Sequence, residues 1–201
     1  MSLNSLISYI SNSQIITELV KRFKNNNELN IIGSSRYAKS ILINSIAEKE
    51  NKDILLISPN EEIAYKWYGY FDSIDNRKVL YYPPSENLPY ASINKSKETE
   101  YLQLSVISKI NKKERKDLNI IITTERSLQP HLINNNQFRE NIFTLVKGVV
   151  LDIKELTKKL VLLGYNKENL TSQEGSWSRR GEIIDIYPVN NELPIRIEYF
   201  D

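Results

Sequence analysis

The sequence contains no cysteine and one histidine, His131, among its 201 residues. A chain without cysteine forms no disulfide and no zinc site with cysteine ligands. Nucleophilic catalysis that depends on histidine would have to use His131, which stands between Pro130 and Leu132 without any pattern of partner residues. A structural role for His131 is therefore the simpler interpretation.

Long apolar runs and a strong net charge are also missing. No run reaches the roughly 18 apolar residues that a membrane span needs. The first residues, MSLNSLISYISNSQ, have no basic segment and no long apolar core, so no signal peptide is expected. We therefore expect a cytoplasmic protein without a membrane partner. The net charge of +2 gives no general sign of nucleic-acid binding.

Apolar runs alternate with amphipathic segments over residues 1–128. Continuous apolar strands separated by helices are typical of a parallel sheet that is covered on both faces. The pattern predicts an α/β domain with strands at Leu29–Ile32, Ile54–Ser58, Val79–Tyr82 and Asn119–Thr123, and helices at Ser13–Phe23, Lys39–Glu48, Glu61–Phe71 and Thr99–Ile110.

A possible phosphate-binding loop follows the first predicted strand. Residues 33–40 read GSSRYAKS, which matches the spacing of a P-loop except that Ala38 replaces the second glycine. Lys39 and Ser40 would supply the lysine for the terminal phosphates and the hydroxyl for magnesium. A methyl group at position 38 disfavours the glycine-like backbone conformation that a phosphate-binding loop needs there. In addition, no acidic magnesium-binding motif follows an apolar strand. The loop is expected to be degenerate and inactive.

The pattern changes after residue 128. Gln129–Asn136 is polar and predicts a crossing between domains. The remainder predicts a small α+β unit that begins with a strand at Ile142–Val146. A helix follows, with a capping box at Asp152 and a C-terminal glycine at Gly164. A short strand is predicted at Leu170–Ser172.

Gly175–Asp201 predicts two strands, Glu182–Tyr187 and Ile195–Phe200, joined by a tight connection. Alternation along the second strand places Ile195, Ile197 and Tyr199 on one face and Arg196, Glu198 and Phe200 on the other. Two charges beside a large aromatic ring are unusual on a face that only meets water.

The strings RRGEIIDIYP and LPIRIEYFD resemble the signature shared by UvrB and the N-terminal module of transcription-repair coupling factors (Mfd). The resemblance implies a degenerate P-loop, helicase-like domain at residues 1–128 and an inserted α+β domain at 129–201. The inserted domain would continue beyond Asp201, in a longer protein. The degenerate loop, and the short link from Tyr90 to the next helix, point to the coupling factors rather than to UvrB.

The resemblance also implies partners. In these families the inserted domain docks onto the damage sensor UvrA. The contacting residues match Arg180, Arg196 and Phe200 here, and Arg180 shares their face only if the strand register allows it. Full-length coupling factors are ATP-driven DNA translocases that displace stalled RNA polymerase. ATP, magnesium, polymerase and double-stranded DNA would be bound by other parts of such a protein, so no cofactor and no catalytic residue is expected in these residues.

Two alternatives remain open. The chain could instead be part of UvrB or of another ATP-binding P-loop protein, with Lys39 and Ser40 active. It could also be an isolated α/β domain with an unrelated role. Nucleotide binding would separate the first alternative from the interaction module.

Overall fold

The computed structural model describes residues 3–74, 78–85, 97–111, 119–129, 134–189 and 191–200. They fall into two compact units, one made of residues 1–85 and 113–130 and the other of residues 86–112 and 131–201. Residues 86–112 were predicted to belong to the first domain, but they group with the second unit. The predicted domain boundary at 128/129 stays a prediction. His131 and Tyr90 lie outside the described residues. None of the described helices has the length and apolar character for crossing a membrane.

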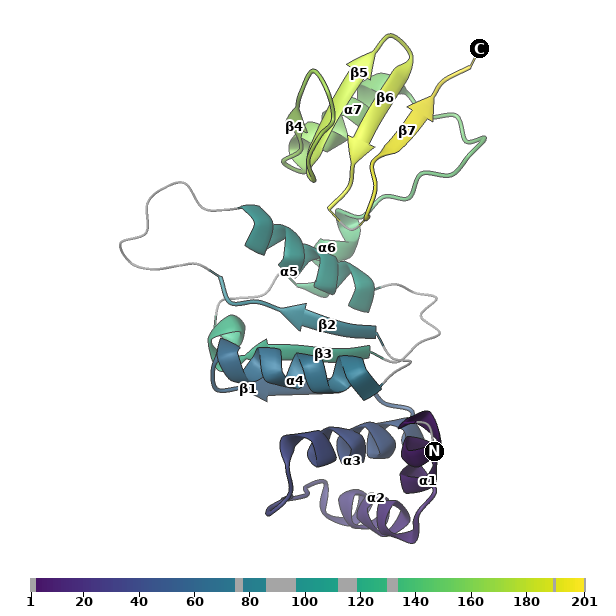
Figure 1. The fold of residues 1–201 in the computed structure, drawn as a ribbon. Coiled ribbons are helices and arrows are strands. Elements are labelled where there is room, and N and C mark those ends of the chain that lie inside the picture. Colours follow the sequence, from purple (N-terminus) through teal and green to yellow (C-terminus); the bar gives the residue numbers. More distant parts are fainter. Residues whose placement is uncertain are drawn as a thin grey trace, which may run out of the picture. The chain divides into compact units, whose positions relative to one another are not determined.

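The first unit contains a parallel sheet (Figure 1). Its strands β1 (Ile54–Ser58), β2 (Lys78–Tyr82) and β3 (Asn119–Thr124) are arranged in the order β1-β3-β2. Ile54 and Val79 both lie opposite Ile120, so the two outer strands flank β3 in the same register. The predicted α/β class and three of its four strands are confirmed.

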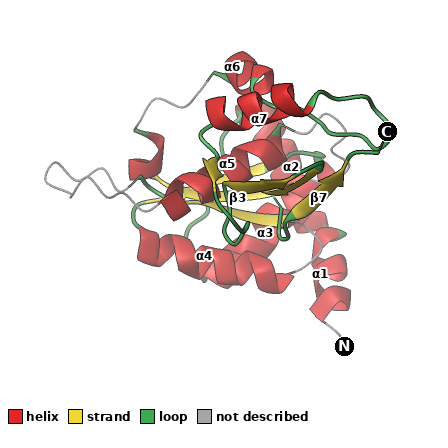
Figure 2. Ribbon diagram, turned by 90° about the horizontal axis from the view of Figure 1, so that it is seen from above, coloured by secondary structure: helices red, strands yellow, loops and turns green. Residues whose placement is uncertain are grey.

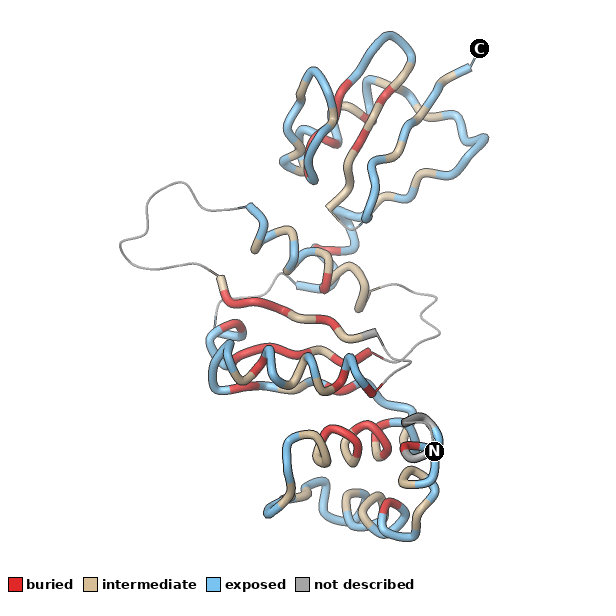
Figure 3. Tube along the Cα trace, in the orientation of Figure 1, coloured by how far each residue is buried: buried red, intermediate tan, exposed pale blue. Residues whose placement is uncertain are grey.

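Helix α4 (Glu61–Ile74) packs on one face of this sheet. Alternation along β1 and β3 directs one set of side chains toward α4, where Phe71 is 1% exposed. Figure 3 shows the buried residues along these elements. The core consists of Ala47, Ile54, Ala64, Phe71, Ile120 and Ile122. A 3-10 helix, Glu125–Leu128, follows β3, and the Thr124 side chain accepts a hydrogen bond from the backbone N–H of Ser127.

Three more helices complete this unit: α1 (Leu3–Ser11), α2 (Gln14–Asn26) and α3 (Arg36–Lys49). The predicted α2 is confirmed, and Ser13 caps it by accepting the N–H of Ile16. Helix α1 was not predicted. The predicted strand Leu29–Ile32 is wrong, because these residues form no strand and Ile32 is 81% exposed. The run is short and polar Asn30 interrupts it, so it offers little apolar surface for a buried strand.

The second unit contains a mixed sheet of β4 (Asn166–Lys167), β5 (Ser176–Arg180), β6 (Ile183–Tyr187) and β7 (Ile195–Glu198), in that order. The pair β4–β5 is parallel and the other pairs are antiparallel. Its helices are α5 (Lys97–Ile110), α6 (Asn135–Glu140) and α7 (Ile153–Leu162). Figure 2 distinguishes these helices and strands by colour.

Several boundaries in the second unit differ from the predictions. The predicted strands Ile142–Val146 and Leu170–Ser172 are wrong, since neither segment pairs with another strand. Phe143 and Leu145 nevertheless pack on the core, so their apolar pattern reflects burial and not the pairing of a strand in a sheet. Strand β5 was not predicted, because SWSRR is mostly polar and lacks apolar alternation.

Helix α7 and the sheet enclose the second core, which consists of Leu156, Leu160, Trp177, Ile184 and Ile186. Asp152 caps α7 by accepting the N–H of Lys154 at 2.7 Å, as its sequence pattern indicates. Gly164 follows the helix with a φ of +81°, which confirms the predicted C-terminal glycine. Glu155 does not close a capping box and pairs instead with Lys159.

Gly175 is the glycine whose replacement should disturb the second unit most. Its φ is +72°, and an added Cβ would collide with the Tyr101 ring and hydroxyl. Gly175→Ala should lower the free energy of unfolding by about 2–5 kcal/mol, the sum of left-handed strain and overpacking. Gly181→Ala is the matched control, since its φ is +60° in open space and its cost should be about 1–2 kcal/mol. Urea unfolding followed by Trp177 fluorescence, in a Trp67→Phe background, measures both. Equal costs would contradict this assignment.

Candidate functional site

The register of β5, β6 and β7 determines which side chains share a face. Ser178 lies opposite Asp185, and Asp185 lies opposite Arg196. Directly opposed residues in antiparallel strands project to the same side, and so do residues two apart. Arg180 and Arg196 therefore share one face of the sheet. Arg179 pairs with Ile184 and belongs to the other face.

This first face, which we call the open face, is turned away from the core of the unit. Helix α7 packs against the other face, through Trp177, Ile184 and Ile186. Figure 1 shows β5, β6 and β7 in front of α7, so the open face is the one toward the viewer. The loop after β4 covers this face at Ser178, where the Thr171 hydroxyl donates to Ser178 Oγ at 3.0 Å.

Arg196 makes a bidentate ion pair on the open face. Its Nε donates to Asp185 Oδ1 at 2.7 Å and its Nη2 donates to Asp185 Oδ2 at 3.0 Å. The Arg196 guanidinium holds the pKa of Asp185 below its usual range, so the pair is ionised at neutral pH. Two parallel bonds fix the guanidinium plane and leave its other N–H groups available. An exposed pair of this kind adds little stability, so its main effect is to orient Arg196.

Arg180 ends β5 beside this pair. Its Nη2 donates to the backbone carbonyl of Asn169 at 3.4 Å, and its positive charge also lowers the pKa of Asp185. Gly181, with a φ of +60°, then turns the chain into β6. Arg180 was not predicted to lie in a strand, whereas the structure places it at the end of β5.

Phe200 extends the open face beyond the end of β7. The Tyr199 N–H donates to the Glu182 carbonyl at 3.1 Å, so strand pairing continues past Glu198. Tyr199 packs on the core, and Phe200 is 86% exposed on the opposite side. The predicted alternation of Ile195, Ile197 and Tyr199 inward against the even-numbered residues is confirmed.

The open face thus gathers Arg180, Arg196 and Phe200 with two acidic residues, Asp185 and Glu198. The sequence analysis did not assign Asp185 a role. Its position between Ile184 and Ile186 marks it as outward-facing, yet only the β6–β7 register shows that it meets Arg196. The face is a mixed-charge surface with one large exposed aromatic side chain, Phe200. No cluster of metal-ligating side chains occurs among the residues that the structure describes.

The loop at Gly33 does not have the form of a nucleotide site. No strand precedes it, and Ser35 caps α3 by accepting the N–H of Ala38. The Ser40 side chain is fully buried, and its hydroxyl donates to the Tyr37 carbonyl at 2.7 Å. Lys39 lies in the first turn of α3 and is half-buried. The residues present therefore do not fit ATP with magnesium, because the Ser40 hydroxyl that should bind the metal is buried.

Exposed tyrosines can stack on nucleic-acid bases, but Tyr81, Tyr82 and Tyr101 take part in packing. Tyr82 is 8% exposed, Tyr81 packs on the core of the first unit, and the Tyr101 ring lies against Gly175. A ring stacks on a base only if one of its faces is accessible. These tyrosines therefore form no stacking surface.

Comparison with known proteins gives this fold a context. Residues 143–201 match the family model described as the UvrB interaction domain. The match contains α7, the mixed sheet and every residue of the open face.

Curated relatives extend the similarity to most of the chain. The chain is 30% identical to the transcription-repair-coupling factor of Bacillus subtilis, over 85% of this chain and 14% of that protein. It is 31% identical to that of Staphylococcus haemolyticus, over 96% and 16%. The UvrABC system protein B of Staphylococcus aureus is 27% identical, over 93% of this chain and 30% of that protein. The resemblance seen in the sequence is confirmed, and the chain spans a small part of these relatives.

The geometry of the loop predicts that the chain does not bind ATP. Titration of a fluorescent ATP analogue with magnesium should give no saturable signal in the micromolar range, since Ala38 disfavours the loop conformation and the Ser40 hydroxyl is buried. Lys39→Ala should leave the titration unchanged. Saturable binding that Lys39→Ala abolishes would favour the P-loop alternative instead.

Proposed function

We propose that this chain, a relative of transcription-repair coupling factors with a UvrB interaction domain at residues 143–201, is a docking module for UvrA. The observation that carries the proposal is the open face itself. It brings together the three residues that match the family's UvrA contacts, Arg180, Arg196 and Phe200, on the side of the sheet away from α7.

Phe200 supplies the apolar part of the interaction. Its ring is 86% exposed, so a partner pocket could cover nearly all of it. Burial of a phenylalanine side chain contributes about 2 kcal/mol. Binding hot spots are typically aromatic or arginine residues that a partner desolvates.

The charged residues of the open face require groups of matching chemistry on UvrA. Arg180 and the free N–H groups of Arg196 call for acceptors, such as carboxylates, on UvrA. Glu198 and the exposed part of the Asp185 carboxylate call for hydrogen-bond donors on UvrA. Because Asp185 already orients Arg196, the guanidinium loses less conformational freedom on binding than an unpaired arginine would.

In this proposal the module recruits UvrA, and with it nucleotide excision repair, to RNA polymerase stalled at DNA damage. ATP-driven translocation, polymerase binding and double-stranded DNA binding are assigned to other parts of a coupling factor. The module itself needs no nucleotide, in keeping with the poor fit of the Gly33–Ser40 loop to ATP.

Single substitutions on the open face should weaken binding to UvrA. Arg180→Ala, Arg196→Ala and Phe200→Ala should each raise the Kd by about 30-fold, as expected for hot spots. Calorimetric titration of the chain with purified UvrA measures the Kd, and circular dichroism verifies folding.

Arg179→Ala is the matched control. It removes the same charge one residue away, from the other face, where the Arg179 Nε donates to the Gly181 carbonyl at 2.8 Å. Its Kd should stay within about threefold of the unmodified chain, as expected outside a hot spot. If all four variants bind equally, or if Arg179→Ala is the most damaging, the open face is not the docking surface.

A further inference from the structure

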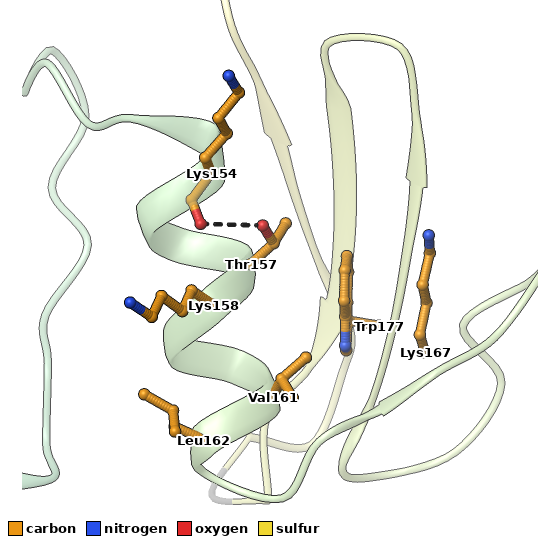
Figure 4. Close-up of a pocket in the computed structure, with 7 residues that line it drawn as sticks. All are labelled: Lys154, Thr157, Lys158, Val161, Leu162, Lys167 and Trp177. Carbon is orange, nitrogen blue, oxygen red and sulfur yellow. Dashed lines mark hydrogen bonds between the residues drawn. The ribbon is translucent and has the colours of Figure 1, made fainter.

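A second surface on the same unit lies between α7 and the β4–β5 edge of the sheet. It is a pocket of about 420 Å³. Figure 4 shows Lys167 and Trp177 on the strands, beside side chains that line up along α7: Lys154, Thr157, Lys158, Val161 and Leu162. The side chains that carry the argument are Lys154, Lys158, Val161, Leu162, Lys167 and Trp177.

The part of this pocket that α7 contributes is a row of side chains, of which two are lysines and two are apolar. Lys154, Lys158 and Leu162 are spaced by four residues, and Val161 completes the last turn, so all four lie on one side of α7. Lys154 lies in the first turn, where the helix dipole disfavours a cation. Val161 and Leu162 are 61% and 76% exposed. The stability of α7 accounts for neither feature, because its packing uses Leu156 and Leu160.

The pocket also contains unused binding capacity. Among the described residues, Lys154, Lys158 and Lys167 form no ion pair, although the Lys167 ammonium lies 5.5 Å from the centre of the Trp177 ring. Trp177 is 4% exposed and its indole N–H has no hydrogen-bond acceptor. A buried donor without a partner costs about 1–3 kcal/mol. The Thr157 hydroxyl beside it is already engaged with the Lys154 carbonyl at 3.1 Å.

The geometry points to a docking groove for an acidic peptide segment of a partner protein, one that carries apolar side chains next to its carboxylates. The carboxylates would meet the three lysines, which have no acidic partner among the described residues. The apolar side chains would cover Val161 and Leu162. Because α7 packs behind the open face, this groove and the UvrA-docking residues belong to opposite sides of the sheet, and both could be occupied together.

A nucleic acid fits the pocket less well. Its phosphates would satisfy the lysines, but stacking needs an accessible aromatic face, and the Trp177 ring is buried. The exposed Val161 and Leu162 side chains would then face a polar sugar-phosphate backbone and stay uncovered.

The test is a titration of the chain with a short synthetic peptide of alternating glutamate and leucine pairs at low ionic strength. The readout is the indole N–H resonance of Trp177 in an amide correlation spectrum, assigned with Trp67→Phe. We expect a saturable shift, because a carboxylate that binds Lys167 changes the charge beside the Trp177 ring. Peptides with glutamine for glutamate, or serine for leucine, should each bind about tenfold more weakly.

Variants of the chain give the matching contrast. Lys154→Glu combined with Lys158→Glu, and Leu162→Ser alone, should each weaken peptide binding about tenfold. Lys147→Glu, an exposed site outside the pocket, and Arg180→Ala on the open face should not. The proposal is overturned if all peptides act alike or if the Trp177 resonance stays still. It is also overturned if a DNA oligonucleotide binds more tightly through the same lysines, or if Leu162→Ser instead dissolves a dimer of the chain in sedimentation.

Discussion

The pairing register of β5, β6 and β7 is the constraint on which the second unit depends. It places Trp177, Ile184 and Ile186 on the side of the sheet that α7 covers, and so creates the core. The same register forces Arg180, Arg196 and Phe200 to the other side. A slip of one residue would exchange the two faces, burying charge and exposing the core. The core and the composition of the open face therefore follow from a single alignment of strands.

That alignment gives a small unit two surfaces of different chemistry. The open face combines an oriented arginine with an exposed ring, while the groove along α7 combines lysines with aliphatic side chains. The first unit contributes no comparable site among its described residues. In its Gly33–Ser40 loop, Ser35 caps α3 and the Ser40 side chain is buried.

Much of this architecture could be predicted where the sequence pattern is long and consistent. The apolar runs of β1, β2 and β3 predicted the parallel sheet, and alternation placed Arg196 and Phe200 on one face. Polar β5 and the two-residue β4 could not be predicted, because tertiary pairing rather than apolar alternation specifies them. The same limit applies to the link between Arg180 and Arg196, which requires the β5–β6–β7 register. Leu29–Ile32 illustrates the opposite error, an apolar run that no neighbouring strand accepts.

The central claim is that UvrA contacts the open face. Site-specific photocrosslinking tests it most directly, with a photoreactive benzoylphenylalanine replacing Phe200 in one chain and Leu162, on α7, in another. Both side chains are highly exposed, so neither replacement should disturb the fold. The account predicts a crosslink to UvrA from position 200 and none from position 162. A crosslink from position 162 alone would contradict it.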